Sequence, residues 1–202
     1  IKRIVDFRSL NEQKKEPNVI INNIEYIDMP INSDKEINKE LKLVLQGKLD
    51  KDIKEFLNEA NRDFITEYSP IFRRFIHLLI YDPKPTLFHC SAGKDRTGFA
   101  AFLILYLCDI DLDTIIKDYL STNEFIEDSI PSQIIHVANI FDIESKYANS
   151  IIPLLKVNID YINSALDEIY KNYDTIDNYI KTGLKITEND KLQLNNYLLN
   201  KL

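Results

Sequence analysis

The most informative segment of this 202-residue chain is residues 86–98, which read Thr-Leu-Phe-His-Cys-Ser-Ala-Gly-Lys-Asp-Arg-Thr-Gly. Residues 86–88 are typical of a β-strand, and residues 99–108 form an apolar run typical of a buried helix. The segment therefore predicts a strand, a loop and a helix in that order. In this arrangement successive backbone N–H groups and the helix N-terminus converge on one anion. The sequence thus predicts an anion-binding loop at the carboxyl end of a strand.

The loop also carries the residues that phosphate chemistry requires. Oriented N–H dipoles and the cation of Arg96 favour the thiolate of Cys90, which can attack phosphorus. The planar guanidinium of Arg96 can hold two equatorial oxygens of the phosphoryl group. This pattern predicts a cysteine-dependent phosphatase that works through a covalent phosphocysteine intermediate. The loop positions between these two residues are the candidate substrate-binding residues Ser91, Ala92, Gly93 and Lys94.

The neighbouring residues have supporting roles in this hypothesis. Thr97 can donate its hydroxyl to the cysteine sulfur, and His89 is expected to orient the loop by bonding to its backbone. Gly93 allows the loop to turn, and Gly98 allows the helix to pack closely. The alternative is a buried structural cysteine beside an arginine that caps a helix. The complete run between a strand and a helix favours the catalytic interpretation.

Two carboxylates are candidates for the general acid that protonates the leaving oxygen. Asp95 lies inside the loop next to Arg96, so its position is fixed by the loop, although it could instead hold the arginine in place. Asp34 follows the second predicted strand, roughly where many cysteine phosphatases carry an acid on a loop. We favour Asp95 and keep Asp34 as the alternative general acid.

Residues 89–98 resemble the active-site loop of the atypical bacterial tyrosine and lipid phosphatases, the tyrosine phosphatase B group, which includes secreted virulence factors. Residues 4–9 followed by Glu12 resemble the Asp-Leu-Arg-Ser segment of that group, and residues 155–183 resemble its C-terminal helices. The resemblance implies a cysteine-phosphatase fold. It also implies phosphotyrosine as the default substrate and phosphoinositides as the second. A non-catalytic phospho-binding module is a third, weaker alternative, because a reader of phosphate needs no nucleophile.

The resemblance also bears on domain organisation. Members of the group carry an N-terminal segment before the Asp-Leu-Arg strand, whereas this chain starts inside that strand at Ile1. We therefore expect residues 1–202 to form a single phosphatase domain without its N-terminal part. In the group, the region that matches residues 121–156 forms a helical lid over the active site. Ordinary core packing is the alternative for this apolar segment.

Lys94 is the residue that bears on substrate choice. A lysine whose side chain points outward from the rim of the anion-binding loop would favour substrates with additional phosphates or acidic flanks. In this group and in phosphoinositide phosphatases, lysine at the matching position accompanies acceptance of inositol lipids. The resemblance therefore keeps phosphorylated proteins and phosphoinositides open as partners.

Composition excludes several other classes of protein. The formal net charge of −7 is a poor match for nucleic acid or for an anionic bilayer, and the longest apolar run is too short to span a membrane. Two cysteines argue against a disulfide framework. Cys108 lies about 16 Å along the helix from Thr97 and is interpreted as a core residue. No metal or cofactor is expected, and the oligomeric state and compartment (cytoplasmic or secreted) stay open.

The rest of the chain alternates strand and helix signals. Residues 1–7, 24–29 and 86–89 predict three strands, so the expected fold is α/β: a small, mainly parallel sheet flanked by many helices. Ser69 before Pro70 predicts a helix N-cap. Thr187 and Asp190 predict a capping box for the last helix.

Overall fold

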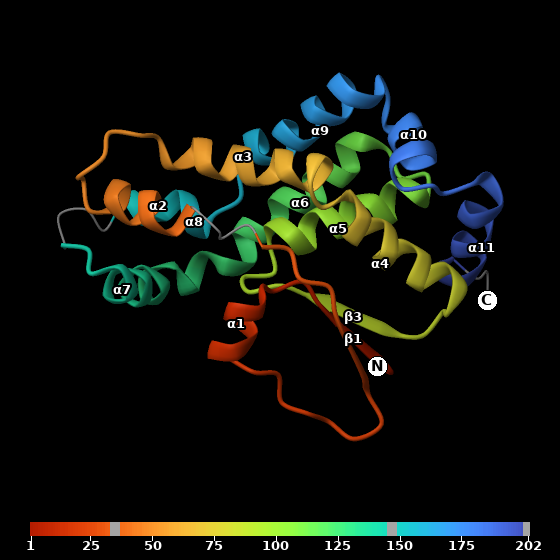
Figure 1. The fold of residues 1–202 in the computed structure, drawn as a ribbon, viewed down its shortest axis with the longest axis horizontal. Helices are drawn as coiled ribbons and strands as arrows, with labels where there is room; N and C mark the ends of the chain where they lie inside the picture. The colour runs from red at the N-terminus through yellow and green to blue at the C-terminus, as the bar shows by residue number, and fades with distance from the viewer. Residues whose placement is uncertain (33–36, 145–148, 200–202) are drawn as a thin grey trace.

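The computed structural model describes residues 1–32, 37–144 and 149–199 (Figure 1). Three strands, β1 Arg3–Asp6, β2 Glu25–Asp28 and β3 Thr86–His89, form the sheet. The helical elements are α1 Leu10–Lys15, α2 Ile37–Leu45, α3 Ile53–Thr66, α4 Ser69–Tyr81, α5 Asp95–Leu107, α6 Leu112–Ile126, η1 Glu127–Ser129, α7 Ile130–Phe141, α8 Ile152–Leu155, α9 Ile159–Tyr173, α10 Ile176–Asn178, η3 Tyr179–Gly183 and α11 Glu188–Leu198.

The sheet has the order β2-β1-β3, and both pairs of strands are parallel. The central residue Ile4 lies opposite Tyr26 on one side and Leu87 on the other. The predicted α/β class, with a small parallel sheet and many helices, is confirmed. Because all three strands run the same way, their carboxyl ends meet at one edge of the sheet, and the loop that follows β3 begins there.

An aromatic core joins the sheet to the helices. The ring of Phe7 packs edge-on against Phe75 of α4 with centroids 5.1 Å apart. Phe72 of α4 packs edge-on against Phe99 of α5 at 4.8 Å. Such edge-to-face pairs add to the stabilisation from burial. This packing fixes α5, and hence the loop before it, relative to β1 and β3.

A second apolar cluster lies apart from this core, in the part of Figure 1 where α2, α7 and α8 meet. Its buried members include Leu45 of α2, Phe56 of α3 and Leu155 of α8. The segment that contains α7 and α8 is joined at its two ends by a contact between α6 and the residues before α9. There the side chain of Asn123 donates to the carbonyl of Val157 and accepts from its N–H, both at 2.9 Å.

The structure confirms one predicted helix cap and corrects another. Thr187 and Asp190 form the expected capping box of α11. Ser69 is not the N-cap of α4: that position is Tyr68, and Ser69 is the first helical residue. Its hydroxyl donates instead to the carbonyl of Ile65 at 2.8 Å and bonds the hydroxyl of Tyr179. The serine therefore stabilises the core between α3, α4 and η3.

None of the helices in the described ranges combines the length and the apolar character needed to cross a bilayer.

Candidate active site

The loop between β3 and α5 forms the centre of the candidate site. Cys90 is buried at the carboxyl end of β3, and α5 begins at Asp95. Gly93 adopts a positive φ of +69°, a conformation that costs little only for glycine. Gly98 serves a different purpose, because a Cβ there would lie 2.9 Å from the ring of Tyr119. Both glycines thus have the roles that the sequence predicted for them.

Arg96 is held in place by a carboxylate from the N-terminal part of the chain. Its two terminal nitrogens, Nη1 and Nη2, donate to the two oxygens of Glu12 at 2.7 and 2.8 Å. Nη1 also lies 3.4 Å from the carbonyl oxygen of Phe7 and 3.3 Å from that of Ile31. A two-pronged pair of this kind fixes the plane of the guanidinium as well as its position.

Glu12 is itself fixed by the start of α1. Ser9 is the N-cap of this helix, and its hydroxyl accepts from the N–H of Glu12. In turn, Oε2 of Glu12 accepts from the N–H of Ser9 at 2.7 Å. Burial pushes the pKa of Glu12 upward, but the hydrogen bonds and charge of Arg96 outweigh it and lower the pKa below its ordinary value. Glu12 is therefore held as a carboxylate against Arg96.

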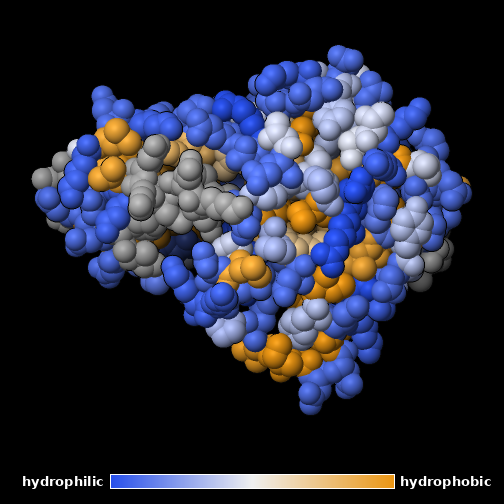
Figure 2. Space-filling view, in the orientation of Figure 1, coloured by the Kyte–Doolittle hydropathy of each residue, from blue (hydrophilic) through white to orange (hydrophobic). Residues whose placement is uncertain are grey.

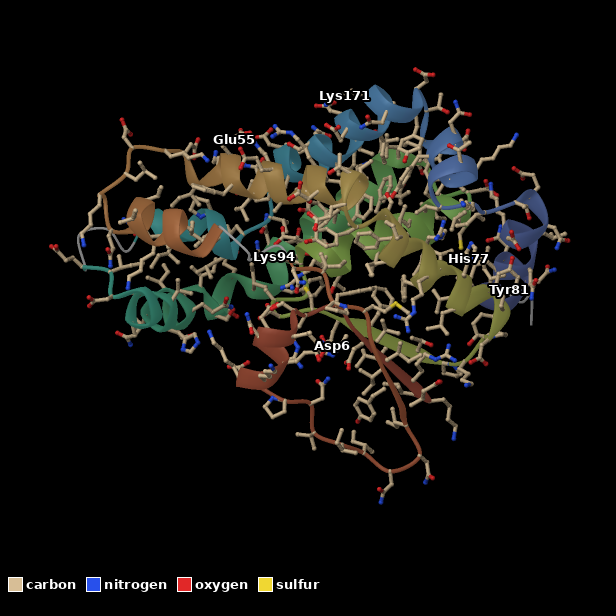
Figure 3. All side chains as sticks on the ribbon, viewed as in Figure 1. Asp6, Glu55, His77, Tyr81, Lys94 and Lys171 are labelled. Atoms are coloured by element: carbon tan, nitrogen blue, oxygen red, sulfur yellow. The ribbon has the colours of Figure 1, made fainter. Side chains whose placement is uncertain are left out.

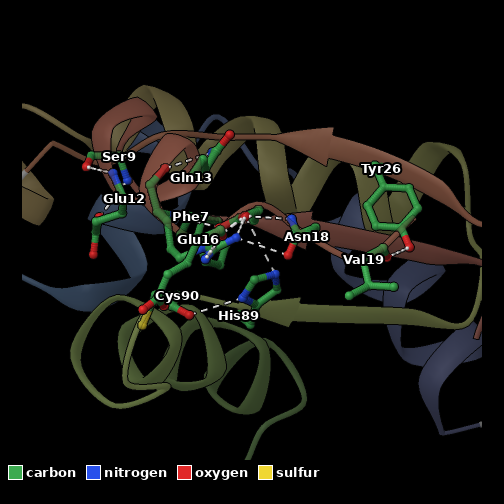
Figure 4. Close-up of polar contacts among 12 residues, drawn as sticks. Phe7, Ser9, Glu12, Gln13, Glu16, Asn18, Val19, Tyr26, His89 and Cys90 are labelled. Atoms are coloured by element: carbon green, nitrogen blue, oxygen red, sulfur yellow. Dashed lines mark hydrogen bonds and ion pairs between the residues drawn. The ribbon is translucent and has the colours of Figure 1, made fainter. Parts of the chain in front are cut away.

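A second network lies beside the loop, at the ends of β1 and β3 (Figure 4). The buried carboxylate of Asp6 accepts from the backbone and guanidinium of Arg8 and from the amide of Asn18. Burial raises the pKa of Asp6, but these hydrogen bonds prevail and lower it. His89 lies with Nε2 3.7 Å from Asp6 and Nδ1 3.0 Å from the carbonyl oxygen of Cys90. Since a carbonyl only accepts, Nδ1 is the donor, and His89 contacts the loop backbone as expected.

Lys94 does not point out of the rim of the loop. Its side chain is only 6% exposed, and it lies in the interior of the molecule in Figure 3. The ammonium is 2.9 Å from a carboxylate oxygen of Asp95 and donates to the carbonyl of Lys156 at 3.4 Å. A buried ammonium needs such partners, and both are supplied here by the protein. The expectation of an outward-facing lysine was wrong.

Asp95 and Thr97 lie in the first turn of α5. The second carboxylate oxygen of Asp95 is buried without a hydrogen-bond partner in the described part of the chain, and so is the hydroxyl of Thr97. The expected bond from Thr97 to the sulfur of Cys90 is thus not formed in this structure. The pKa of the buried Tyr119 hydroxyl is raised, mainly by burial and, to a smaller extent, by the negative charge of the nearby Asp95.

The other candidate acid, Asp34, lies outside the described residues. The segment before it does reach the site, because the carbonyl of Ile31 accepts from Arg96. Cys108, at the far end of α5, has a free and partly buried thiol, and burial raises its pKa. Within the described ranges, no group of three or more His, Cys, Asp or Glu side chains could hold a metal ion.

The roles of Glu12 and Asp6 are not predicted from the sequence. The spacing of Ser9 and Glu12 is that of a capping box, which is a local signal for the start of α1. The pairing of Glu12 with Arg96 spans 84 residues, and nothing in the local pattern predicts it.

Comparison with known proteins identifies the family. The family model described as the tyrosine phosphatase family matches residues 1–200 of this chain. The chain belongs to the tyrosine phosphatase family. This confirms the resemblance seen in the loop, and it confirms the prediction of an enzyme, a phosphoric monoester hydrolase of the protein-tyrosine-phosphatase type.

Relatives from bacteria extend this result. A Cupriavidus necator protein named as a tyrosine-protein phosphatase is 28% identical over 97% of this chain and 69% of its own length. The triple specificity protein phosphatase PtpB of Mycobacterium tuberculosis is 30% identical over 62% of this chain and 49% of its own length. The chain thus spans about half to two-thirds of the length of these relatives.

Proposed function

We propose that this member of the tyrosine phosphatase family hydrolyses phosphotyrosine through a covalent phosphocysteine intermediate. The observation that carries the proposal is the geometry of the loop. Cys90 lies where β3 ends, α5 begins five residues later, and Arg96 is fixed in orientation by Glu12. A nucleophile, backbone donors and a positioned cation are the groups that phosphoryl transfer needs.

The reaction would proceed in two steps. The thiolate of Cys90 attacks phosphorus, the bond from phosphorus to the tyrosyl oxygen breaks, and Asp95 supplies the proton that this oxygen takes up. Water then attacks the phosphocysteine while Asp95 accepts a proton, the phosphorus–sulfur bond breaks, and phosphate leaves with the thiolate restored. Arg96 would stabilise the equatorial oxygens in both steps, and Thr97 would assist departure of the sulfur after a change of its side-chain rotamer.

The mechanism can be tested with the two cysteines. Cys90→Ser should abolish turnover while phosphate binding persists, because the hydroxyl is far harder to ionise and the rest of the loop remains. Acid quenching of the wild-type reaction should trap one phosphate per chain on Cys90. Cys108→Ser is the matched control and should retain full activity. Residual turnover of Cys90→Ser within about tenfold of wild type would refute the covalent mechanism.

Phosphoinositides are the second proposed substrate class. The name of the Mycobacterium tuberculosis relative specifies three substrate classes without naming them, and that breadth is consistent with a dual-specific enzyme. Lys94 is buried, so its ammonium does not face outward to additional phosphates of a substrate. A panel of phosphotyrosine peptides, phosphoserine peptides and phosphoinositides, compared by kcat/KM, decides among them. Binding of all substrates without turnover would favour the non-catalytic module.

We also propose that residues 1–202 act as one phosphatase domain and that residues 121–156 act as a lid. The support for a lid is the separate apolar cluster and the Asn123–Val157 contact at its base. Asn123→Ala would weaken this base, and limited proteolysis should then cut residues 121–156 sooner than in wild type.

A further inference from the structure

The loop between α1 and β2 leaves three consecutive apolar side chains in solvent. Val19, Ile20 and Ile21, here called the apolar tip, are 82%, 74% and 52% exposed. Figure 2 shows an orange patch at the lower end of the molecule, where Figure 1 places this loop. Single exposed apolar residues are common on protein surfaces, but a contiguous group marks an interaction surface.

The backbone of this loop is fixed, so the exposure does not result from a slack chain. The hydroxyl of Tyr26 in β2 donates to the carbonyl of Val19 at 2.9 Å (Figure 4). The same hydroxyl accepts from the N–H of Ile21 at 3.0 Å. At the start of the loop, Arg8 donates to the carbonyl of Glu16 at 2.8 Å and to the side chain of Asn18 at 3.0 Å. None of these bonds uses an apolar side chain of the tip. The tip is therefore built to present those side chains outward.

The charge beside the tip is opposite in sign to that of the whole chain. Between residues 13 and 24 the sequence carries two lysines, Lys14 and Lys15, and one acid, Glu16, which gives a net charge of +1 against −7 overall. Both lysines are exposed in the last turn of α1. Apolar side chains that enter the interface, next to lysines that face the headgroups, are the combination that binds an anionic bilayer.

We propose that the apolar tip and the two lysines dock this protein on an anionic lipid surface. The same helix α1 that carries the lysines is capped by Ser9 and places Glu12 against Arg96. Six helical residues span about 9 Å, so the two lysines of the docking surface lie within one short helix of the Glu12–Arg96 pair. Docking would hold this loop close to phosphorylated headgroups or to membrane-bound phosphoproteins. The inference concerns binding, and it can fail while the proposed phosphatase activity stands.

Vesicle sedimentation tests the proposal. The wild-type chain is mixed with phosphatidylcholine vesicles, either alone or with roughly one-third phosphatidylserine. The tip variant is Val19→Ser/Ile20→Ser/Ile21→Ser. The charge variant is Lys14→Ser/Lys15→Ser. The matched control is Leu192→Ser/Leu199→Ser, which removes two apolar side chains that are 59% and 53% exposed at α11.

We expect wild type and control to bind the anionic vesicles alike. Both the tip and the charge variants should bind about tenfold or more weakly. Binding should weaken strongly at about 1 M salt. Thermal unfolding checks that all variants are folded, which is expected because the replaced side chains make none of the bonds that fix the loop.

Three results would overturn the proposal. The first is equal binding of wild type to neutral and anionic vesicles, or no binding to either. The second is unchanged binding of the tip variant or of the charge variant. The third is a dimer of the wild type in light scattering that the tip variant abolishes, because the tip would then contact a second copy of the chain.

Discussion

Replacing Glu12 by glutamine keeps the size and shape of the side chain but removes the charge that faces Arg96. In the wild type two hydrogen bonds, at 2.7 and 2.8 Å, join a guanidinium that is 11% exposed to a carboxylate that is 23% exposed. Glutamine offers one acceptor oxygen and turns an amide NH₂ toward the other nitrogen of Arg96. One of the two bonds becomes a contact between two donors.

The structure sets the scale of both effects. Hydrogen bonds to charged groups contribute about 1.5–3 kcal/mol, and the pair is neither fully exposed nor fully buried. We expect Glu12→Gln to cost about 2 kcal/mol of unfolding free energy, which is a fall of about 4–8 °C in Tm for a chain of this length. Loss of the fixed guanidinium orientation should lower kcat by about 10- to 100-fold with a smaller change in KM, because in the proposed mechanism Arg96 stabilises mainly the transition state.

Steady-state kinetics on a phosphotyrosine peptide, with calorimetry alongside, measures both quantities. Glu16→Gln is the matched control: it removes an exposed carboxylate just beyond the same helix, and the backbone carbonyl that Arg8 contacts remains. If Glu12→Gln raises KM and leaves kcat unchanged, Glu12 does not position a catalytic Arg96. The same conclusion follows if Glu16→Gln has an equal effect.

The pH dependence gives an independent check of the same pair. The pKa of Glu12 is lowered in the folded state, so the pair stabilises the fold fully above the ordinary value near 4.5. This contribution is lost as the pH falls through the lower folded-state value. The difference in unfolding free energy between wild type and Glu12→Gln should therefore be constant at neutral pH and shrink below about pH 4. If this difference in unfolding free energy stays constant down to about pH 2, the charge of the Glu12 carboxylate is not its source.

Three further predictions concern residues of the loop and α5. Asp95→Asn should reduce hydrolysis of phosphotyrosine peptides by about 100-fold and flatten the basic limb of the pH–rate profile, with little effect on aryl phosphates that have good leaving groups; equal loss on both substrates would argue against a general acid. Gly98→Ala should lower Tm, because a Cβ 2.9 Å from the Tyr119 ring costs about 1–3 kcal/mol, more than the helix propensity gained. Peroxide should inactivate the enzyme at Cys90, and mass spectrometry should find no disulfide to Cys108.

The features predicted correctly from sequence are those that depend on neighbouring residues. The strand, loop and helix around Cys90 follow from β propensity, a glycine-permitted turn and an apolar helical run. The capping box at Thr187 follows from a spacing of three residues. Ser69 shows the limit of such rules: its position before Pro70 fits an N-cap, but its hydroxyl finds partners in Ile65 and in the distant Tyr179. Tertiary contacts override local capping there.

The surroundings of the proposed catalytic residues depend on contacts that no local pattern encodes. Arg96 is oriented by a residue 84 positions away, and Lys94 is turned inward by a carbonyl 62 positions away. An exposed lysine at the rim would have been a substrate contact, whereas the buried one links Asp95 to the end of residues 121–156 through the carbonyl of Lys156. Movement of that segment would take away one partner of a buried ammonium, which is costly unless the lysine moves too. The position of Asp95 is therefore coupled to the region proposed as the lid.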